Sequence, residues 1–310
     1  MRPERRLLLT RRSFGLGVTA SAAAAPALAE ASLEARFKAI EARTGGRLGL
    51  WAGQIGEGRS VSWRAGERFL MCSTFKSLAV SAVLARVDHG QEKLDRWIKY
   101  SPADLQEYAP VAKANVDRGG MTLETICAGA IEVSDNTCAN LILDALGGPQ
   151  GVTNFVRDLG DQTTRLDRTE PTLNRPGPAG DPHDTTTPAS MTGLWRRILF
   201  PRRPGVQYGP YPGPLSAAPL ALLNGWLEAS TPGPNRLKAA TPPGWRIGHK
   251  TGLGSTTAGD VAVWTPPSGA PILIAIYLEV AGALDNSHDD AFAEVGRLAL
   301  NHIAGVGVVG

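Results

Sequence analysis

A serine and a lysine near residue 75 have the types and the spacing that nucleophilic chemistry requires. Ser73 and Lys76 stand at the start of an apolar stretch, Thr74 to Asp88, whose pattern predicts a helix. Residues three apart share one helical face, so the two side chains lie together. A lysine of lowered pKa can take the proton of a serine hydroxyl and make it a nucleophile. Free N–H groups at the helix start suit a developing oxyanion.

Two further motifs follow along the chain. Ser134-Asp135-Asn136 lies between two predicted helices, and Lys250-Thr251-Gly252 follows a predicted strand. Taken singly, Ser-x-x-Lys can be a helix cap with a solvated lysine, Ser-Asp-Asn a helix cap, and Lys-Thr-Gly a strand end before a turn. In this order, the three together are the signature of penicillin-recognising serine enzymes.

The chain resembles a class A serine β-lactamase from about Leu33 to Ile303. Besides the three motifs, the resemblance rests on Tyr108, Trp245 and two stretches of a loop, Arg168–Asn174 and Asp181–Pro188. The Glu-x-x-Leu-Asn element within the first stretch separates class A enzymes from other penicillin-recognising relatives. It supplies a carboxylate suited to a second, deacylating step.

The resemblance implies a role for each residue of the reaction. Ser73 attacks the β-lactam carbonyl and forms an acyl-enzyme, with the backbone N–H groups of Ser73 and Leu253 as oxyanion hole. Glu170 and Asn174 hold the water that hydrolyses the ester. Either Lys76 or Glu170, acting through that water, is the base for acylation. Ser134 passes a proton to the leaving nitrogen.

The resemblance also implies the substrate contacts. Lys250 and Thr251, in the turn completed by Gly252, bind the substrate carboxylate. Asn136 binds the acylamino side chain and Tyr108 forms a wall of the cleft. Many relatives place an arginine on the strand after this turn, and here Arg236 is expected to replace it. No metal and no cofactor are expected.

The loop around Glu170 departs in places from the common family pattern. Arg168 and Asp184 resemble the pair that closes this loop at its neck, and the Glu170–Pro171 bond is open to either isomer. The run from Arg175 to Gly180 is one residue longer than is common. Leu253 stands where relatives more often have a small or hydroxylated residue.

The order of the predicted elements indicates an α+β fold. Strand patterns gather near the two chain ends and helical patterns fill the middle, and short turns between the late strands favour antiparallel pairing. We expect an antiparallel sheet flanked by terminal helices, with an inserted all-helical domain and the site between the two. The expected domains are 30–70 with 230–310 for the sheet part and 71–229 for the helical part. The strands are expected at 47–55, 60–63, 245–250, 260–264 and 271–280, and the main helices at 33–44, 74–88, 123–131, 137–146, 152–159, 191–199, 215–229 and 289–303.

Residues 1–29 have the layout of a secretory signal. A basic start, an apolar stretch and an Ala27-Leu28-Ala29 site predict cleavage before Glu30, and Arg11-Arg12 indicates the twin-arginine route. The expected destination is the periplasm or the medium. The leader holds five arginines and one glutamate, so the whole-chain charge of +3 becomes nearly neutral on cleavage. Nothing in that balance favours nucleic acid or an anionic membrane, and no apolar stretch is long enough to span one. We expect a monomer.

Other residues that carry chemistry have plainer interpretations. The three cysteines, Cys72, Cys127 and Cys138, are expected to be buried free thiols. The five histidines form no His-x-His cluster, which disfavours a zinc hydrolase.

Two alternatives to β-lactam hydrolysis remain. One is a cell-wall transpeptidase or carboxypeptidase, against which Glu170 and Asn174 argue. The other is a β-lactam sensor that is acylated without turnover.

Overall fold

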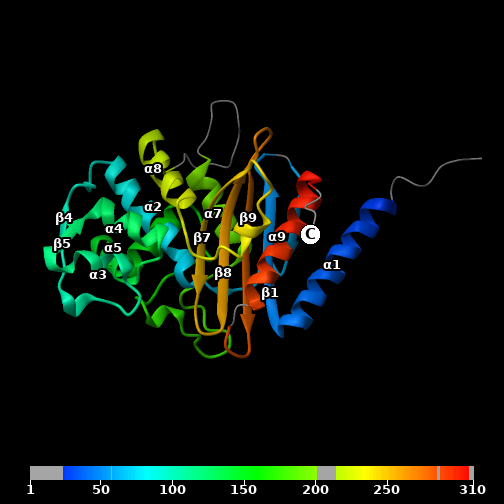
Figure 1. Cartoon of the computed structure of the whole chain (residues 1–310), viewed down its shortest axis with the longest axis horizontal. Helices are drawn as coiled ribbons and strands as arrows, with labels where there is room; N and C mark the ends of the chain where they lie inside the picture. Colours follow the sequence, from blue (N-terminus) through cyan, green and yellow to red (C-terminus); the bar gives the residue numbers. More distant parts are fainter. Residues whose placement is uncertain (1–23, 57, 201–213, 285–286, 307–310) are drawn as a thin grey trace, which may run out of the picture.

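The computed structural model of the chain describes residues 24–56, 58–200, 214–284 and 287–306. These residues form the predicted mixed fold, in which helices cover both faces of an antiparallel sheet (Figure 1). Most of the predicted signal, up to residue 23, lies outside the described residues, as does the Pro- and Gly-rich stretch 201–213.

A five-stranded sheet joins strands from the two ends of the chain. Its order is β2-β1-β9-β8-β7, and all neighbours are antiparallel. The first strands therefore lie beside the last ones, with Leu50 opposite Ile276. The strands of this sheet are β1 (Gly46–Gln54), β2 (Ser60–Trp63), β7 (Arg246–Leu253), β8 (Thr257–Thr265) and β9 (Ile272–Val280). Two small ladders pair β3 (Phe69–Leu70) with β6 (Thr185–Thr186) and β4 (Trp97–Lys99) with β5 (Gly120–Thr122).

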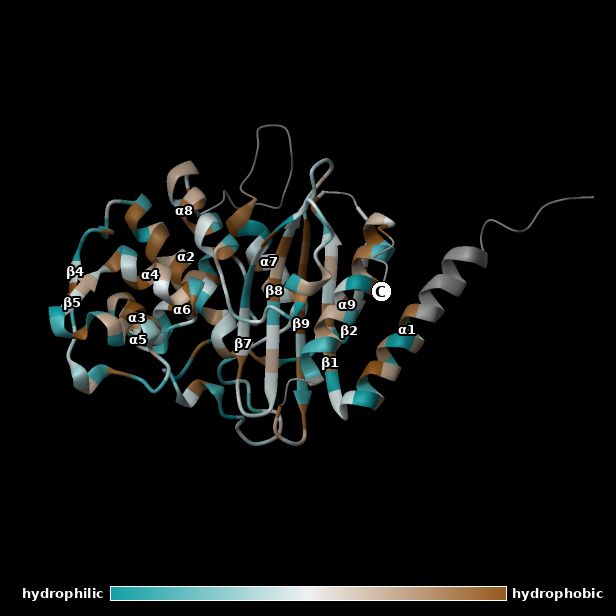
Figure 2. Cartoon of the chain, viewed as in Figure 1, coloured by the Kyte–Doolittle hydropathy of each residue, from teal (hydrophilic) through white to brown (hydrophobic). Residues whose placement is uncertain are grey.

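Each face of the sheet contributes to a separate hydrophobic core. Successive side chains of a strand point to opposite faces, so Ala262 of β8 lies in one core and Val261 in the other. Helices α1 (Ala24–Thr44) and α9 (Ser287–Ala304) cover the first face, and the remaining helices build the second core, as the brown segments in Figure 2 indicate.

Helix α2 (Phe75–Asp88) is the central helix of the second core, and a short 3-10 turn (Cys72–Thr74) precedes it. Every residue in its first three turns is buried. A helix that is apolar on all sides belongs inside a protein. Its buried polar groups have partners: the Ser77 hydroxyl accepts from Trp195 Nε1 at 3.1 Å. Lys76 therefore lies in the enclosed part of the helix.

The other helices surround α2. They are α3 (Pro110–Asn115), α4 (Leu123–Glu132), α5 (Asn136–Leu146), α6 (Pro149–Asp158), α7 (Pro188–Leu199) and α8 (Ala217–Glu228). Side-chain caps fix where several of them begin, as where Thr187 accepts from the Ser190 N–H at the start of α7. Among the described helices none is long and apolar enough to cross a membrane.

The sequence analysis missed α3 and the two small ladders because such short elements show no periodicity. Helix α1 begins at Ala24, ahead of the predicted Leu33, and runs through the expected cleavage point before Glu30. Its first residues are rich in alanine, which has the highest helix propensity. The proposed division into a sheet domain and a helical domain stays a prediction.

Candidate active site

Five predicted residues meet at the start of α2, where the helical part faces β7. Ser73 Oγ lies 3.3 Å from Glu170 Oε1, and Lys76 Nζ lies 3.1 Å from the same oxygen. The Ser134 hydroxyl lies between two lysines, 3.4 Å from Lys76 Nζ and 2.9 Å from Lys250 Nζ. The structure therefore brings two serine hydroxyls, a carboxylate and two amines into one buried cluster.

Burial is the largest influence on the pKa of both lysines. It lowers the pKa of Lys76, and the nearby Glu170 carboxylate opposes that shift. The pKa of Lys250 lies well below its ordinary value because the amine is buried and because the positive charge of Lys76 repels it. The side chains of Lys76 and Glu170 are both fully buried, so their interaction is not screened by solvent. An amine of lowered pKa is able to accept a proton from a neighbouring hydroxyl.

Replacing Lys250 with methionine is expected to flatten the pH dependence of stability on the alkaline side. The native protein releases the Lys250 proton at a lower pH than the unfolded chain, whose lysines titrate near 10.5. Between those two pKa values the unfolded state binds more protons, so the free energy of unfolding of the wild type rises with pH. Urea unfolding over an alkaline pH series measures the slope. The exposed Lys93→Met variant should keep the wild-type slope, and a Lys250→Met variant that also keeps it contradicts the prediction.

The turn that carries Ser134 and Asn136 is fixed by the residue between them. Asp135 is fully buried and begins α5 by accepting from the Cys138 N–H at 2.8 Å. Its second carboxylate oxygen accepts from two N–H groups of α3, those of Val111 and Ala112. This cap leaves Ser134 in a left-handed backbone conformation with a φ of 62°.

Lys76 completes the same turn from the other side. Its amine donates to the Ser134 carbonyl at 2.9 Å and to Asn136 Oδ1 at 2.6 Å. One amine therefore contacts both the first and the last residue of the motif. The Asn136 N–H in turn donates to the carbonyl of Tyr108, whose side chain is 53% exposed at the rim.

Glu170 is held through its backbone by a residue that the sequence analysis did not single out. Asn140 of α5 accepts from the Glu170 N–H at 2.9 Å and donates to the Glu170 carbonyl at 3.0 Å. The Glu170–Pro171 bond, which the sequence left open, is cis. Asn174 donates to Glu170 Oε2 at 2.5 Å, and its own Oδ1 is buried with no partner among the described residues. Asn140 lies one helical turn after Asn136, on the same face of α5. That spacing was the feature of the sequence that could have identified Asn140 as a residue of the site.

An Asn140→Ala substitution is expected to lower both stability and the rate of the step that needs Glu170. Two buried backbone groups lose their partner, which costs about 1–3 kcal/mol of unfolding free energy. A carboxylate displaced by a fraction of an ångström slows that step by roughly tenfold to a hundredfold. Urea unfolding and single-turnover kinetics measure the two effects. The matched control is Asn154→Ala on the exposed side of α6, which should change neither; a normal rate in Asn140→Ala would refute the positioning role.

The predicted pair at the neck of the Glu170 loop is present. Arg168 Nε lies 2.5 Å from Asp184 Oδ2, and the Asp184 side chain is fully buried. Asp184 also accepts from the backbone N–H groups of Asp167 and Arg168, at 2.7 and 2.9 Å. The pair is therefore part of a hydrogen-bonded network and not an isolated surface ion pair.

Strand β7 brings Lys250, Thr251, Gly252 and Leu253 alongside the turn that carries Ser73. A side chain at Gly252 would place its Cβ 2.7 Å from the Met71 carbonyl, so only glycine allows this close approach. Leu253 ends the strand with its side chain 57% exposed. Ser73 and Leu253, whose backbone N–H groups are proposed to form the oxyanion hole, therefore lie on two segments that contact each other.

Arg236 is buried, and its guanidinium group already has hydrogen-bond and ion-pair partners within the protein. Its Nε lies 2.6 Å from Asp289 Oδ1, and Nη1 donates to the carbonyls of Gly252 and Gly259. It lines a cavity of about 280 Å³ together with Thr251 and Leu253. The structure therefore places it beside the predicted carboxylate contacts, where it also braces β7 and β8.

A buried pair between β7 and β8 was not predicted. His249 Nδ1 lies 3.1 Å from Asp260 Oδ1, and both side chains are fully buried. The other oxygen of Asp260 accepts from the Leu237 N–H, next to Arg236. This pair links the strand that carries Lys250 to the segment that carries Arg236.

The prediction for the cysteines is confirmed. All three are buried free thiols, and burial raises the pKa of Cys72, Cys127 and Cys138 alike. Within the described ranges no group of three His, Cys, Asp or Glu side chains could hold a metal ion.

The arrangement suits acyl transfer to a serine. A hydroxyl lies within reach of a carboxylate and near an amine that can accept protons, and a second hydroxyl is placed to relay one. The chain belongs to the β-lactamase enzyme family, whose model matches residues 32–303.

Relatives and solved structures agree with that assignment. The chain is 42% identical to β-lactamase AST-1 of Nocardia asteroides over 287 residues, 92% of this chain and 85% of the relative. It is similar to the class A β-lactamase of the last common ancestor of Gram-negative bacteria (GNCA4), with 47% identity and a TM-score of 0.79 over 87% of this chain and 98% of that one. A β-lactamase from Burkholderia vietnamiensis gives 41% identity and a TM-score of 0.79, over 86% and 94%.

Proposed function

We propose that the protein hydrolyses the β-lactam amide of penicillins and cephalosporins through a serine acyl-enzyme, and so confers β-lactam resistance. The observation that carries the proposal is the buried cluster in which one oxygen of Glu170 approaches both Ser73 and Lys76. Membership of the β-lactamase family and similarity to named class A enzymes support it.

In the proposed acylation, Ser73 Oγ adds to the lactam carbonyl carbon and gives up its proton to Lys76, or to Glu170 through a water. The backbone N–H groups of Ser73 and Leu253 stabilise the oxyanion. The C–N bond then breaks, and Ser134 delivers a proton to the leaving nitrogen. Its hydroxyl lies 2.9 Å from Lys250 Nζ and 3.4 Å from Lys76 Nζ, so the proton can be replaced from either amine.

In the proposed deacylation, Glu170 takes a proton from a water that attacks the ester carbonyl. The contact from Asn174 to Glu170 Oε2 and the unpartnered Asn174 Oδ1 support a shared role in orienting that water. The C–O bond to Ser73 then breaks, Glu170 passes the proton to Ser73 Oγ, 3.3 Å away, and the ring-opened product leaves. A carboxylate in this place argues against the transpeptidase and sensor alternatives, which the comparisons do not favour either.

The substrate is proposed to lie along β7. Lys250 and Thr251 would bind its carboxylate, with Arg236 adding positive charge behind Gly252. Asn136 would meet the acylamino group and Tyr108 would cover the cleft from the rim. These roles need no metal or cofactor.

Export by the twin-arginine route to the periplasm or the medium is proposed on the sequence of the leader, residues 1–29. A monomer is proposed as the working form.

A stopped-flow trace with a chromogenic cephalosporin and a chelator tests the function. Sustained turnover of many equivalents is the expected result. A burst of one equivalent followed by a plateau would overturn hydrolysis and favour the sensor. A trace with neither burst nor turnover would remove Ser73 as the nucleophile.

A further inference from the structure

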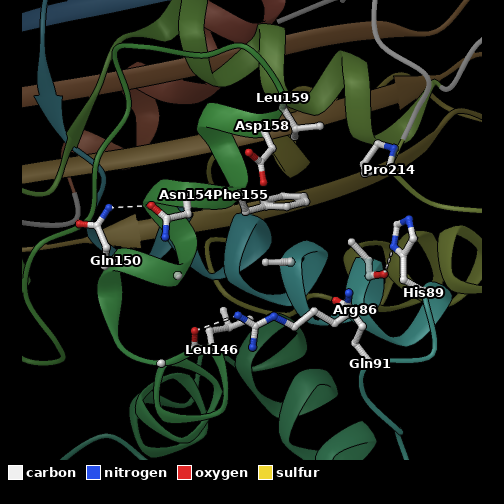
Figure 3. A pocket seen from close by; sticks show the side chains of 14 residues that line it. Arg86, His89, Gln91, Leu146, Gln150, Asn154, Phe155, Asp158, Leu159 and Pro214 are labelled. Atoms are coloured by element: carbon white, nitrogen blue, oxygen red, sulfur yellow. Dashed lines mark hydrogen bonds between the residues drawn. The ribbon is translucent and has the colours of Figure 1, made fainter.

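A cavity of about 460 Å³ lies away from the serine, between the end of α2, the end of α5 and helix α6 (Figure 3). None of the predicted site residues lines it. Lys76 is in the first turn of α2, whereas Ala82 and Arg86 line the cavity, so the cavity begins roughly 9–15 Å along the helix from Lys76. Its volume falls in the range of small-molecule sites.

Arg86, which lines the cavity, already donates hydrogen bonds within the protein. Arg86 donates from Nη1 to the Ala145 carbonyl and from Nη2 to the Leu146 carbonyl, both at 2.9 Å. These carbonyls end α5, where the negative end of the helix dipole offsets the positive charge. Arg86 therefore forms a fixed wall and is a poor anchor for an anion.

Among the other polar groups that line the cavity, beside the amides of Gln91, Gln150 and Asn154, a histidine and an aspartate offer acceptors. His89 Nδ1 lies 2.6 Å from the Ala85 carbonyl, which can only accept, so Nδ1 carries the proton. In the neutral ring, Nε2 is then an acceptor. The exposed Asp158 carboxylate makes no hydrogen bond or ion pair with any residue that the structure describes. A ligand that enters the cavity meets a carboxylate and a ring nitrogen that both need a donor.

An aromatic side chain supplies the apolar surface. Phe155 is half-buried, and Figure 3 shows its ring between Asp158 and Arg86. The opposite rim, at Pro214, is held against α2 because the Asp88 carboxylate accepts from the Ser216 N–H and hydroxyl at 2.5 and 2.6 Å. The cavity thus has an aromatic face and a carboxylate at its edge.

We propose that this cavity binds an organic cation that carries a flat apolar group, such as an aryl amidinium. Asp158 is the counter-ion, and Phe155 offers its face to the ring or to the cation. The site is separate from the serine, and the proposal does not depend on the β-lactamase reaction.

Calorimetric titration of the purified protein with benzamidinium tests the site. We expect saturable binding, and binding of the neutral isostere benzamide weaker by about fivefold, in the range for a partly exposed ion pair. Asp158→Asn should weaken benzamidinium binding about fivefold and leave benzamide unchanged. Asp144→Asn, an exposed carboxylate of α5 outside the cavity, is the matched control and should bind as the wild type does.

Three results would overturn the proposal. They are the absence of saturation in the millimolar range, equal affinity for benzamide and benzamidinium, and wild-type affinity in a folded Asp158→Asn variant. A thermal melt establishes that each variant is folded. Phe155→Leu gives a second, independent arm, because loss of the aromatic face should weaken both probes.

Discussion

Replacing Glu170 with glutamine should leave acylation largely intact and slow hydrolysis of the acyl-enzyme about a thousandfold. Glutamine keeps the volume of the side chain and an oxygen for Asn174 to contact, but it does not accept a proton. General-base catalysis of this kind contributes about 10²–10⁴-fold. Glu170 Oε1 faces Ser73 and Oε2 is bound by Asn174, so the carboxylate is held on both sides, and it is the one carboxylate of the five-residue cluster.

Mass spectrometry and stopped-flow absorbance measure this result together. The variant should show a burst of one equivalent and a protein mass raised by one bound substrate. The control is Glu124→Gln, an exposed glutamate at the start of α4, which should turn over normally. Turnover at the wild-type rate in Glu170→Gln would remove Glu170 as the deacylating base.

Replacing Lys76 with methionine should slow acylation itself by about a thousandfold, with no acyl-enzyme accumulating. The amine contacts Glu170, Ser134 and Asn136 at once, and its lowered pKa suits it to accept the serine proton. Methionine fills the same space without a charge. Because Glu170 is then buried without its partner, we also expect a loss of about 3–5 kcal/mol of stability.

The two variants together decide which group is the acylation base. If Lys76→Met stays folded and acylates at the wild-type rate while Glu170→Gln acylates slowly, the base is Glu170 acting through water. Rapid-quench measurement of the acyl-enzyme resolves the two cases. Lys99→Met, an exposed lysine of β4, controls for the loss of one positive charge.

The parts of the fold that depend on local pattern were predictable from the sequence. Alternation predicted the late strands, which pair as expected, and the apolar run after Ser73 predicted the buried helix α2. The position of Lys76 beside Ser73 follows from helical spacing. The resemblance to class A enzymes implied that Ser134 and Lys250 share one site, and the structure has Lys250 Nζ 2.9 Å from Ser134 Oγ.

The parts that depend on partners far apart in the chain were not predictable. Nothing local indicates that Arg236 pairs with Asp289, or that His249 pairs with Asp260, because each pair forms only when α9 or β8 packs into place. Asn140 is an ordinary helical residue until the Glu170 loop lies against it. Periodicity predicts on which side of a helix or strand a residue lies, but it does not predict which distant residue packs against that side.

The position of β1 in the sheet has a consequence for the order of folding. β1 pairs along its full length with β9, so the first strand to leave the ribosome has no edge partner on that side until nearly the whole chain is made. Contacts of such high sequence separation slow folding, because the chain closes a long loop before it gains them. The 3-10 turn that carries Ser73 packs against β7 and β8, so its native contacts also form only after the last strands are in place. Recovery of activity during refolding should therefore report completion of the entire sheet.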